Sequence, residues 1–223
     1  MTEHARSCLA AFDFDGTLTQ RDTLAGFLVH ASGLPKMAKI LVRQSRQLLQ
    51  GARDDLLRDA AKTSVIAAAL RGLTVEQLES AGTSYATQLH RQLRTETINH
   101  LHWHQAQGHT TIIVSASLVY YLRPLATSLG FDDVIGVEMA HDSSRVVTGE
   151  LTHPNVRAEQ KRLRLQAWIG EHFQDQPELW AYGNSSGDDQ LLEMADHRVW
   201  IGKRAERNEG SNAGAAPWST DAN

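Results

Sequence analysis

The chain of 223 residues has only one cysteine, Cys8, so it cannot form an internal disulfide bond. This excludes the class of small domains held together by a disulfide framework. A chain with a single thiol is typical of a reducing compartment. We therefore expect Cys8, which stands at the start of the first apolar run, to be a packing residue rather than a bridge.

Long apolar runs and a basic charge balance are also missing. No stretch approaches the length of a membrane span, and the first ten residues, MTEHARSCLA, lack the apolar segment of a signal peptide. The net charge of −4 and the pI of about 6.2 give no basic footprint for nucleic acid or an anionic membrane. We expect a soluble, cytoplasmic protein with no membrane span and no nucleic-acid partner.

The composition that is present, 41% hydrophobic and 22% charged residues, is that of an ordinary globular protein. An apolar run over 8–14 predicts a first buried strand, and residues 23–97 then repeat apolar positions at helical spacing. Strand and helix patterns alternate afterwards, and 132–140 is predicted to pair with 145–152 in a hairpin. The pattern predicts an alternating β/α core that a helical insertion interrupts after its first strand.

Polar residues follow several of the predicted core strands at the points where these strands end. In open parallel sheets, ligands bind beyond the carboxyl ends of the strands. Carboxylate and amide oxygens suit Mg²⁺, while a hydroxyl and a lysine suit phosphoryl oxygens, so the set predicts a site for a metal and a phosphate. The residues at these positions are Asp13, Asp15, Ser115, Asn184, Ser185 and Asp188, with Lys161 near the start of a helix that can reach the same edge.

Four short motifs at these positions occur in a fixed order: DFDGT, VSAS, NVRAEQK and GNSSGDD. In these motifs the sequence resembles the haloacid dehalogenase superfamily of phosphohydrolases, in its phosphoserine-phosphatase-like branch. The resemblance implies a Rossmann-like three-layer core with a parallel sheet, formed by residues 1–20 and 97–205. It also implies an inserted all-helical cap over residues 21–96, and the Gly- and Ser-rich segment 206–223 is expected to be a disordered tail.

The resemblance also implies a role for each motif residue. Asp13 is implied as the nucleophile that forms an aspartyl-phosphate, and Asp15 as the general acid and base. Ser115 and Lys161 are implied as the groups that hold the phosphoryl oxygens of the substrate.

The same resemblance implies Mg²⁺ as the cofactor. Its implied ligands are the Asp13 carboxylate, the main-chain carbonyl of Asp15 and the side chains of Asn184 and Asp188. The family usually has aspartate where this chain has Asn184, so we expect weaker metal binding. Phosphoserine phosphatases commonly carry paired glycines after the second-motif serine, where this chain has Ala116 and Ser117, which argues against phosphoserine as the substrate.

Some of these residues have alternative interpretations. Asp22 stands where the related enzyme has an acidic residue that contacts substrate, but it could equally cap the first helix of the insertion, and we favour the cap. A calcium loop around Asp13 is disfavoured because the stretch lacks the closing glutamate of an EF-hand. His100 and His104, four residues apart, could hold a metal, but a surface helix is favoured because no acidic or cysteine partner accompanies them.

The sequence therefore predicts a Mg²⁺-dependent phosphomonoester hydrolase that acts on a small phosphorylated metabolite. The alternatives are a phosphotransferase or mutase that uses the same aspartyl-phosphate, and a catalytically weak phosphate-binding regulatory protein, for which Asn184 is the argument.

Overall fold

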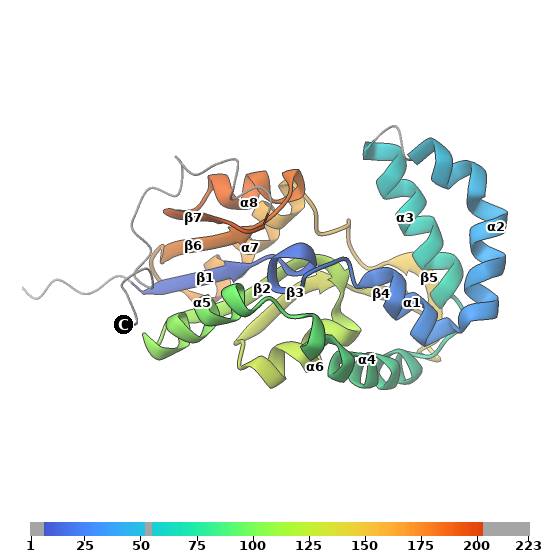
Figure 1. Cartoon of the computed structure of the whole chain (residues 1–223), viewed down its shortest axis with the longest axis horizontal. Helices are drawn as coiled ribbons and strands as arrows, with labels where there is room; N and C mark the ends of the chain where they lie inside the picture. The colour runs from blue at the N-terminus through green and yellow to red at the C-terminus, as the bar shows by residue number, and fades with distance from the viewer. Residues whose placement is uncertain (1–6, 52–54, 203–223) are drawn as a thin grey trace, which may run out of the picture.

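A parallel five-stranded sheet forms the centre of the computed structural model, which describes residues 7–51 and 55–202 (Figure 1). The strands lie in the order β3-β2-β1-β6-β7, and each neighbouring pair is parallel. The central strand β1 is almost wholly buried, as expected for a strand covered on both faces. The strands are β1 (Cys8–Phe12), β2 (Thr110–Leu118), β3 (Asp133–Val137), β6 (Glu178–Gly183) and β7 (His197–Trp200).

Helices cover both faces of this sheet and complete three layers. The chain moves from β1 to β3 in one direction across the sheet and from β6 to β7 in the other. Because such crossovers are right-handed, α5 and α6 cover one face and α8, with α7 beside it, covers the other (Figure 1). This confirms the predicted α/β fold. The core helices are α5 (Thr95–Ala106), α6 (Val119–Leu129), α7 (Glu159–His172) and α8 (Asp189–Glu193), with the short turn η3 (Ser186–Asp188) before α8.

The helical insertion lies beyond the carboxyl end of β1, at the right of Figure 1. It follows one irregular helical turn (η1, Phe14–Leu18) and returns to the core at α5. Among the helices of the described ranges, none combines the length and apolar character that a membrane span requires. The helices of the insertion are α1 (Leu24–Ser32), α2 (Leu34–Gly51), α3 (Asp55–Leu70), α4 (Val75–Leu89) and the turn η2 (His90–Gln92).

A small antiparallel hairpin, β4 (Met139–His141) with β5 (Val147–Leu151), is joined to the insertion through main-chain hydrogen bonds. The amide of Gly72 donates to the carbonyl of Val147 at 3.0 Å, and the amide of Val147 donates to the carbonyl of Leu73 at 2.9 Å. The amide of Val75 donates to the carbonyl of Arg145 at 2.9 Å. The turn between α3 and α4 is therefore fixed to this hairpin.

The prediction that 132–140 forms one strand of this hairpin was wrong in its first part. Asp133–Val137 pairs with β2 as an edge strand of the main sheet, and only Met139–His141 pairs with β5. The Asp132 carboxylate accepts a hydrogen bond from the amide of Thr111 at 2.7 Å, which fixes the start of β3 beside β2. An apolar run predicts a strand but does not show where it changes partner.

The division into a core domain (1–20 and 97–205) and a cap domain (21–96) stays a prediction. Buried side chains of the insertion, among them Phe27 and Leu78, belong to the same hydrophobic cluster as Phe12 of the sheet. An ion pair also crosses between the two parts, from the Arg157 guanidinium to the Asp59 carboxylate at 2.7 Å. The predicted disordered tail, 206–223, lies outside the described residues.

The histidine-bearing face of α5 is buried, which corrects the expectation of a surface helix. His100 is 4% exposed and His104 is 0% exposed. The rings of both histidines lie against that of Tyr182 from β6. Histidine is intermediate in its preference for the interior, so the alternation of His with apolar residues along α5 did not show which face is covered.

Candidate active site

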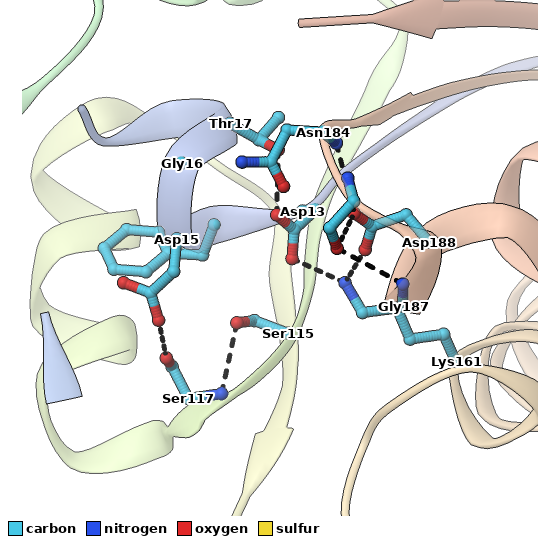
Figure 2. A network of polar contacts seen from close by, with 12 residues as sticks. Asp13, Asp15, Gly16, Thr17, Ser115, Ser117, Lys161, Asn184, Gly187 and Asp188 are labelled. Carbon is cyan, nitrogen blue, oxygen red and sulfur yellow. Dashed lines mark hydrogen bonds and ion pairs between the residues drawn. The ribbon is translucent and has the colours of Figure 1, made fainter. Parts of the chain in front are cut away.

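The first two acidic residues of the predicted site follow β1 directly. The amide of Asp13 donates to the carbonyl of Tyr182 at 2.9 Å, which continues the sheet pairing for one residue and fixes the start of the turn. Gly16 then adopts a φ of 84°, a conformation that favours glycine. A Cβ atom on Gly16 would lie 1.9 Å from the Asn184 side-chain nitrogen. The missing side chain therefore lets the first and fourth motifs approach each other (Figure 2).

Asp13, Lys161 and Asp188 form a buried ionic cluster at this edge of the sheet (Figure 2). The Lys161 ammonium lies 2.5 Å from Oδ1 of Asp13 and 2.7 Å from Oδ1 of Asp188. The three residues are 6%, 2% and 1% exposed. The Thr17 hydroxyl donates to Oδ2 of Asp13 at 2.8 Å and fixes the second oxygen of that carboxylate.

The charges of this cluster do not balance, because two carboxylates share one ammonium. Burial, with Asp188 nearby, raises the pKa of Asp13 to about 6 although Lys161 opposes the shift. Burial disfavours the charge of Lys161 as well, but the two carboxylates hold the pKa of Lys161 above its ordinary value. The cluster therefore carries excess negative charge, centred on Asp13, that a cation can neutralise.

The Asp188 carboxylate is held by the loop that carries the fourth motif. Burial alone would raise its pKa, but Lys161 and main-chain donors hold the pKa of Asp188 below its ordinary value. Oδ2 of Asp188 accepts from the amide and the hydroxyl of Ser185 at 2.9 Å each, and from the amide of Asn184 at 3.1 Å. The amide of Ala158 donates to the carbonyl of Gly187 at 2.9 Å, which fixes the start of the Lys161 helix against this loop.

A divalent cation fits the donors at this edge by their chemistry. The Asp13 carboxylate, the Asn184 amide oxygen and the carbonyl of Asp15 are hard oxygen donors of the kind that Mg²⁺ binds. Asp188 adds negative charge to this group. The excess negative charge around Asp13 favours a cation at the same place.

Asp15 lies beside the ionic cluster but is held by a different set of groups. Its Oδ1 accepts from the amide and the hydroxyl of Thr23 at 2.8 Å each, and its Oδ2 accepts a short hydrogen bond from the Ser117 hydroxyl. Burial, with Asp22 nearby, raises the pKa of Asp15. Figure 2 shows the Asp15 carboxylate pointing toward Ser117, away from Lys161.

Ser115 lies at the end of the apolar part of β2, below Asp13 in the view of Figure 2. It is 2% exposed, and its Oγ accepts from the amide of Ser117 at 3.1 Å. Asp22 is placed differently. Its Oδ1 accepts from the amide of Leu24 at 2.9 Å at the start of α1, and its side chain is 60% exposed. The N-cap position of α1 is Thr23, so Asp22 lies one residue before the cap, not at it as predicted, and makes a local turn contact with the first residue of the helix.

The structure thus brings all four motifs into contact, because Lys161 of the third motif joins Asp13 of the first to Asp188 of the fourth, and Ser117 of the second donates to Asp15 of the first. Three further residues contact the two aspartates but were not predicted from the sequence as site residues: Thr17, Thr23 and Ser117. Thr17 is part of the quoted DFDGT motif. Ser117 closes the VSAS motif, at a position where phosphoserine phosphatases commonly carry glycine. Nothing in the sequence pattern of Thr23 distinguishes it from a helix cap.

Comparisons with known proteins identify a family and a fold. The model of the haloacid dehalogenase-like hydrolase family matches residues 10–193. The protein CicA of Caulobacter vibrioides is 32% identical over 201 residues, which is 88% of each chain. A Bordetella pertussis structure of unknown function has a TM-score of 0.73 at 17% identity and covers 91% of this chain and 94% of its own. A substrate-bound phosphoserine phosphatase has a TM-score of 0.60 at 16% identity and covers 88% of this chain and 87% of its own.

The two kinds of match support different conclusions. The structural matches, at under 20% identity, show the shared fold, which agrees with the predicted three-layer core. The family model spans most of the chain and includes Asp13, Ser115, Lys161 and Asp188. With the identity to CicA over most of both chains, it confirms the family predicted from the four motifs. The chain belongs to the haloacid dehalogenase-like hydrolases.

Proposed function

We propose that this hydrolase cleaves phosphate monoesters through an aspartyl-phosphate on Asp13, with Mg²⁺ as its cofactor and a small phosphorylated metabolite as its substrate. The observation that carries the proposal is the buried cluster in which Lys161 lies between Asp13 and Asp188. A carboxylate nucleophile and a phosphate monoester repel each other. Lys161 offsets this repulsion on the protein side, and Mg²⁺ would supply further positive charge at the phosphoryl oxygens.

The chain's own groups account for the two chemical steps. An Asp13 carboxylate oxygen forms a bond to phosphorus while the bond to the leaving oxygen breaks, and that oxygen takes the proton of Asp15. Water then attacks the phosphorus of the aspartyl-phosphate, its proton passes to Asp15, and inorganic phosphate leaves. Asp15 must start protonated, and its raised pKa favours that form. The Ser115 hydroxyl and the Lys161 ammonium are the groups proposed to hold the phosphoryl oxygens.

The test of this proposal is turnover of p-nitrophenyl phosphate by the full chain. We expect release of p-nitrophenol that depends on added Mg²⁺ and stops with a chelator, and acid-quenched enzyme should carry phosphate on Asp13. An added acceptor alcohol separates the alternatives, because a transferase would phosphorylate it whereas a hydrolase yields inorganic phosphate alone. Binding of phosphate without any turnover would instead support the regulatory alternative.

Asn184 provides a prediction about the metal. Asn184→Asp places a third carboxylate beside Asp13 and Asp188, so we expect Mg²⁺ to bind about tenfold more tightly in calorimetric titration. The same charge is unfavourable without the ion, so the melting temperature of the metal-free variant should fall and recover on adding Mg²⁺. Asn99→Asp, at an exposed position of α5, is the matched control. Equal Mg²⁺ affinities for Asn184→Asp and the parent chain would contradict this interpretation.

Ser117 provides a prediction about the pH profile. Its hydroxyl donates to the Asp15 carboxylate and so favours the charged form. Ser117→Ala removes this donor, and we expect the pKa of Asp15 to rise further. Activity requires protonated Asp15, so the alkaline limb of kcat/KM should move to higher pH. Ser144→Ala, on an exposed turn, should leave the profile unchanged, and a purely structural role for Ser117 would leave the limb in place.

The proposal also includes a cytoplasmic location. Its support is the single cysteine, which suits a reducing compartment.

A further inference from the structure

Three side chains with soft or borderline donor atoms meet at the opposite end of the sheet from Asp13. Cys8 begins β1, His104 lies in the last turn of α5, and His109 directly precedes β2. One ligand atom of each, the Cys8 sulfur and a ring nitrogen of each histidine, lies within 4.8 Å of the others. The parallel pairing of β1 with β2 places their starting residues side by side and so brings these side chains together.

The histidine rings are oriented by hydrogen bonds. Nδ1 of His104 lies 2.8 Å from Nδ1 of His109, and Nε2 of His104 lies 2.9 Å from the Tyr182 hydroxyl. When Nε2 of His104 donates to Tyr182, its Nδ1 carries a lone pair that faces His109. A second hydrogen bond of this kind is the usual way in which proteins orient a metal-binding histidine.

The surroundings keep the imidazoles in the form that binds metals. His104 is 0% exposed, and burial lowers its pKa to about 3. Burial also lowers the pKa of His109, so both rings are neutral at neutral pH. Burial, with the carboxylates of Glu178 and Asp196 nearby, raises the pKa of Cys8 to about 12, so the thiol stays protonated until a cation binds its sulfur.

We propose that Cys8, His104 and His109 bind one Zn²⁺ ion at this end of the sheet, with water at the fourth position. A thiolate and two imidazoles are ligands that Zn²⁺ takes in tetrahedral sites, and they are poor ligands for Mg²⁺. Tetrahedral Zn²⁺ bonds place two nitrogen ligands about 3.3 Å apart, so the histidine nitrogens would separate by roughly half an ångström. The Cys8 thiol gives up its proton to solvent when the Zn–S bond forms.

This site does not depend on the proposed phosphatase activity. Its ligands come from the start of β1, the end of α5 and the turn before β2, whereas Asp13 lies beyond the other end of β1. A Zn²⁺ ion there would link the end of α5 to the starting ends of β1 and β2. We expect a stabilising role, because a ligand that binds only the folded chain raises the free energy of unfolding.

Cobalt substitution tests the proposal on the full chain, reduced and stripped of metal. Excess Mg²⁺ is added so that it fills the proposed catalytic site. We expect one equivalent of Co²⁺ to produce a sulfur-to-cobalt charge-transfer band together with the strong visible bands of four-coordinate cobalt. Zn²⁺ should abolish these bands and raise the melting temperature of the chain. Cys8→Ser should lose the charge-transfer band, and His109→Asn should weaken binding at least about tenfold.

Matched variants separate this site from others. His102→Asn, at an exposed position of the same helix, and Asp13→Asn should both keep the full cobalt spectrum. Cys8 and His109 are only partly buried, so their variants are better suited to the test than changes at buried His104. A folded wild-type chain without the charge-transfer band would overturn the proposal, as would a band that survives in Cys8→Ser. In that case the three residues would form only a packed hydrogen-bond network.

Discussion

Asp13→Asn is expected to lower the turnover of p-nitrophenyl phosphate by at least about 10⁴-fold, because an amide cannot form the aspartyl-phosphate. The loss should appear in kcat, and acid-quenched protein should carry no phosphate. Asp175→Asn, an exposed residue far along the chain, is the matched control and should keep full activity. Residual activity within tenfold of the parent chain would show that another group is the nucleophile.

The same variant should be more stable than the parent chain above about pH 6. Burial raises the pKa of Asp13 to about 6, so its charged form is less favourable in the folded chain than in the unfolded one. An acidic group whose pKa is raised by folding destabilises the fold most above that pKa, where the group is charged. Asparagine carries no charge, so the variant avoids this loss of stability. In thermal unfolding without metal, Asp13→Asn should have a higher melting temperature than the parent chain at pH 7.5. The difference between the two melting temperatures should be smaller at pH 4.5.

Lys161→Met is the second change with a large expected effect. Without the ammonium, the buried carboxylates of Asp13 and Asp188 face each other with no positive partner. Removing one member of a buried ion pair typically costs about 3–5 kcal/mol, and we expect a loss of this size in the free energy of unfolding at pH 8. Urea denaturation provides the measurement, and turnover should fall at the same time because a phosphate-binding charge is missing.

The pH dependence of Lys161→Met distinguishes this electrostatic cause from a packing defect. The two carboxylates would have raised pKa values in the folded variant, so folding takes up protons and stability increases as the pH falls. We therefore expect the deficit to shrink between pH 8 and pH 5. Lys39→Met, at an exposed position of α2, should change stability little at either pH. A deficit that is the same at both pH values would indicate lost packing.

The sequence predicted most of the residues at the proposed catalytic site because their positions are determined by strand ends. Asp13 follows β1, Ser115 lies on β2 and Asp188 follows β6, and parallel neighbours end at the same edge of the sheet. The family and the α/β fold predicted from the motifs are confirmed. The roles of these residues and the Mg²⁺ ion remain predictions.

Other features could not be predicted because they depend on contacts between distant parts of the chain. The short hydrogen bond from Ser117 to Asp15 joins residues 102 positions apart, and no local pattern announces it. The burial of His104 depends on Tyr182 and on the face that α5 turns to the sheet. A metal near His104 was disfavoured because no cysteine accompanies this histidine in the sequence. That argument was wrong, because the pairing of β1 with β2 brings Cys8 close to His104.

The hydrogen bonds between the α3–α4 turn and the β4–β5 hairpin have a consequence for chimaeras of this protein. The insertion is attached not only where the chain enters and leaves it but also at Gly72, Leu73 and Val75. A swap of residues 21–96 alone would leave three main-chain groups of the hairpin without partners. The segment to transplant with the helices is therefore 139–151, and the two pieces should be exchanged together.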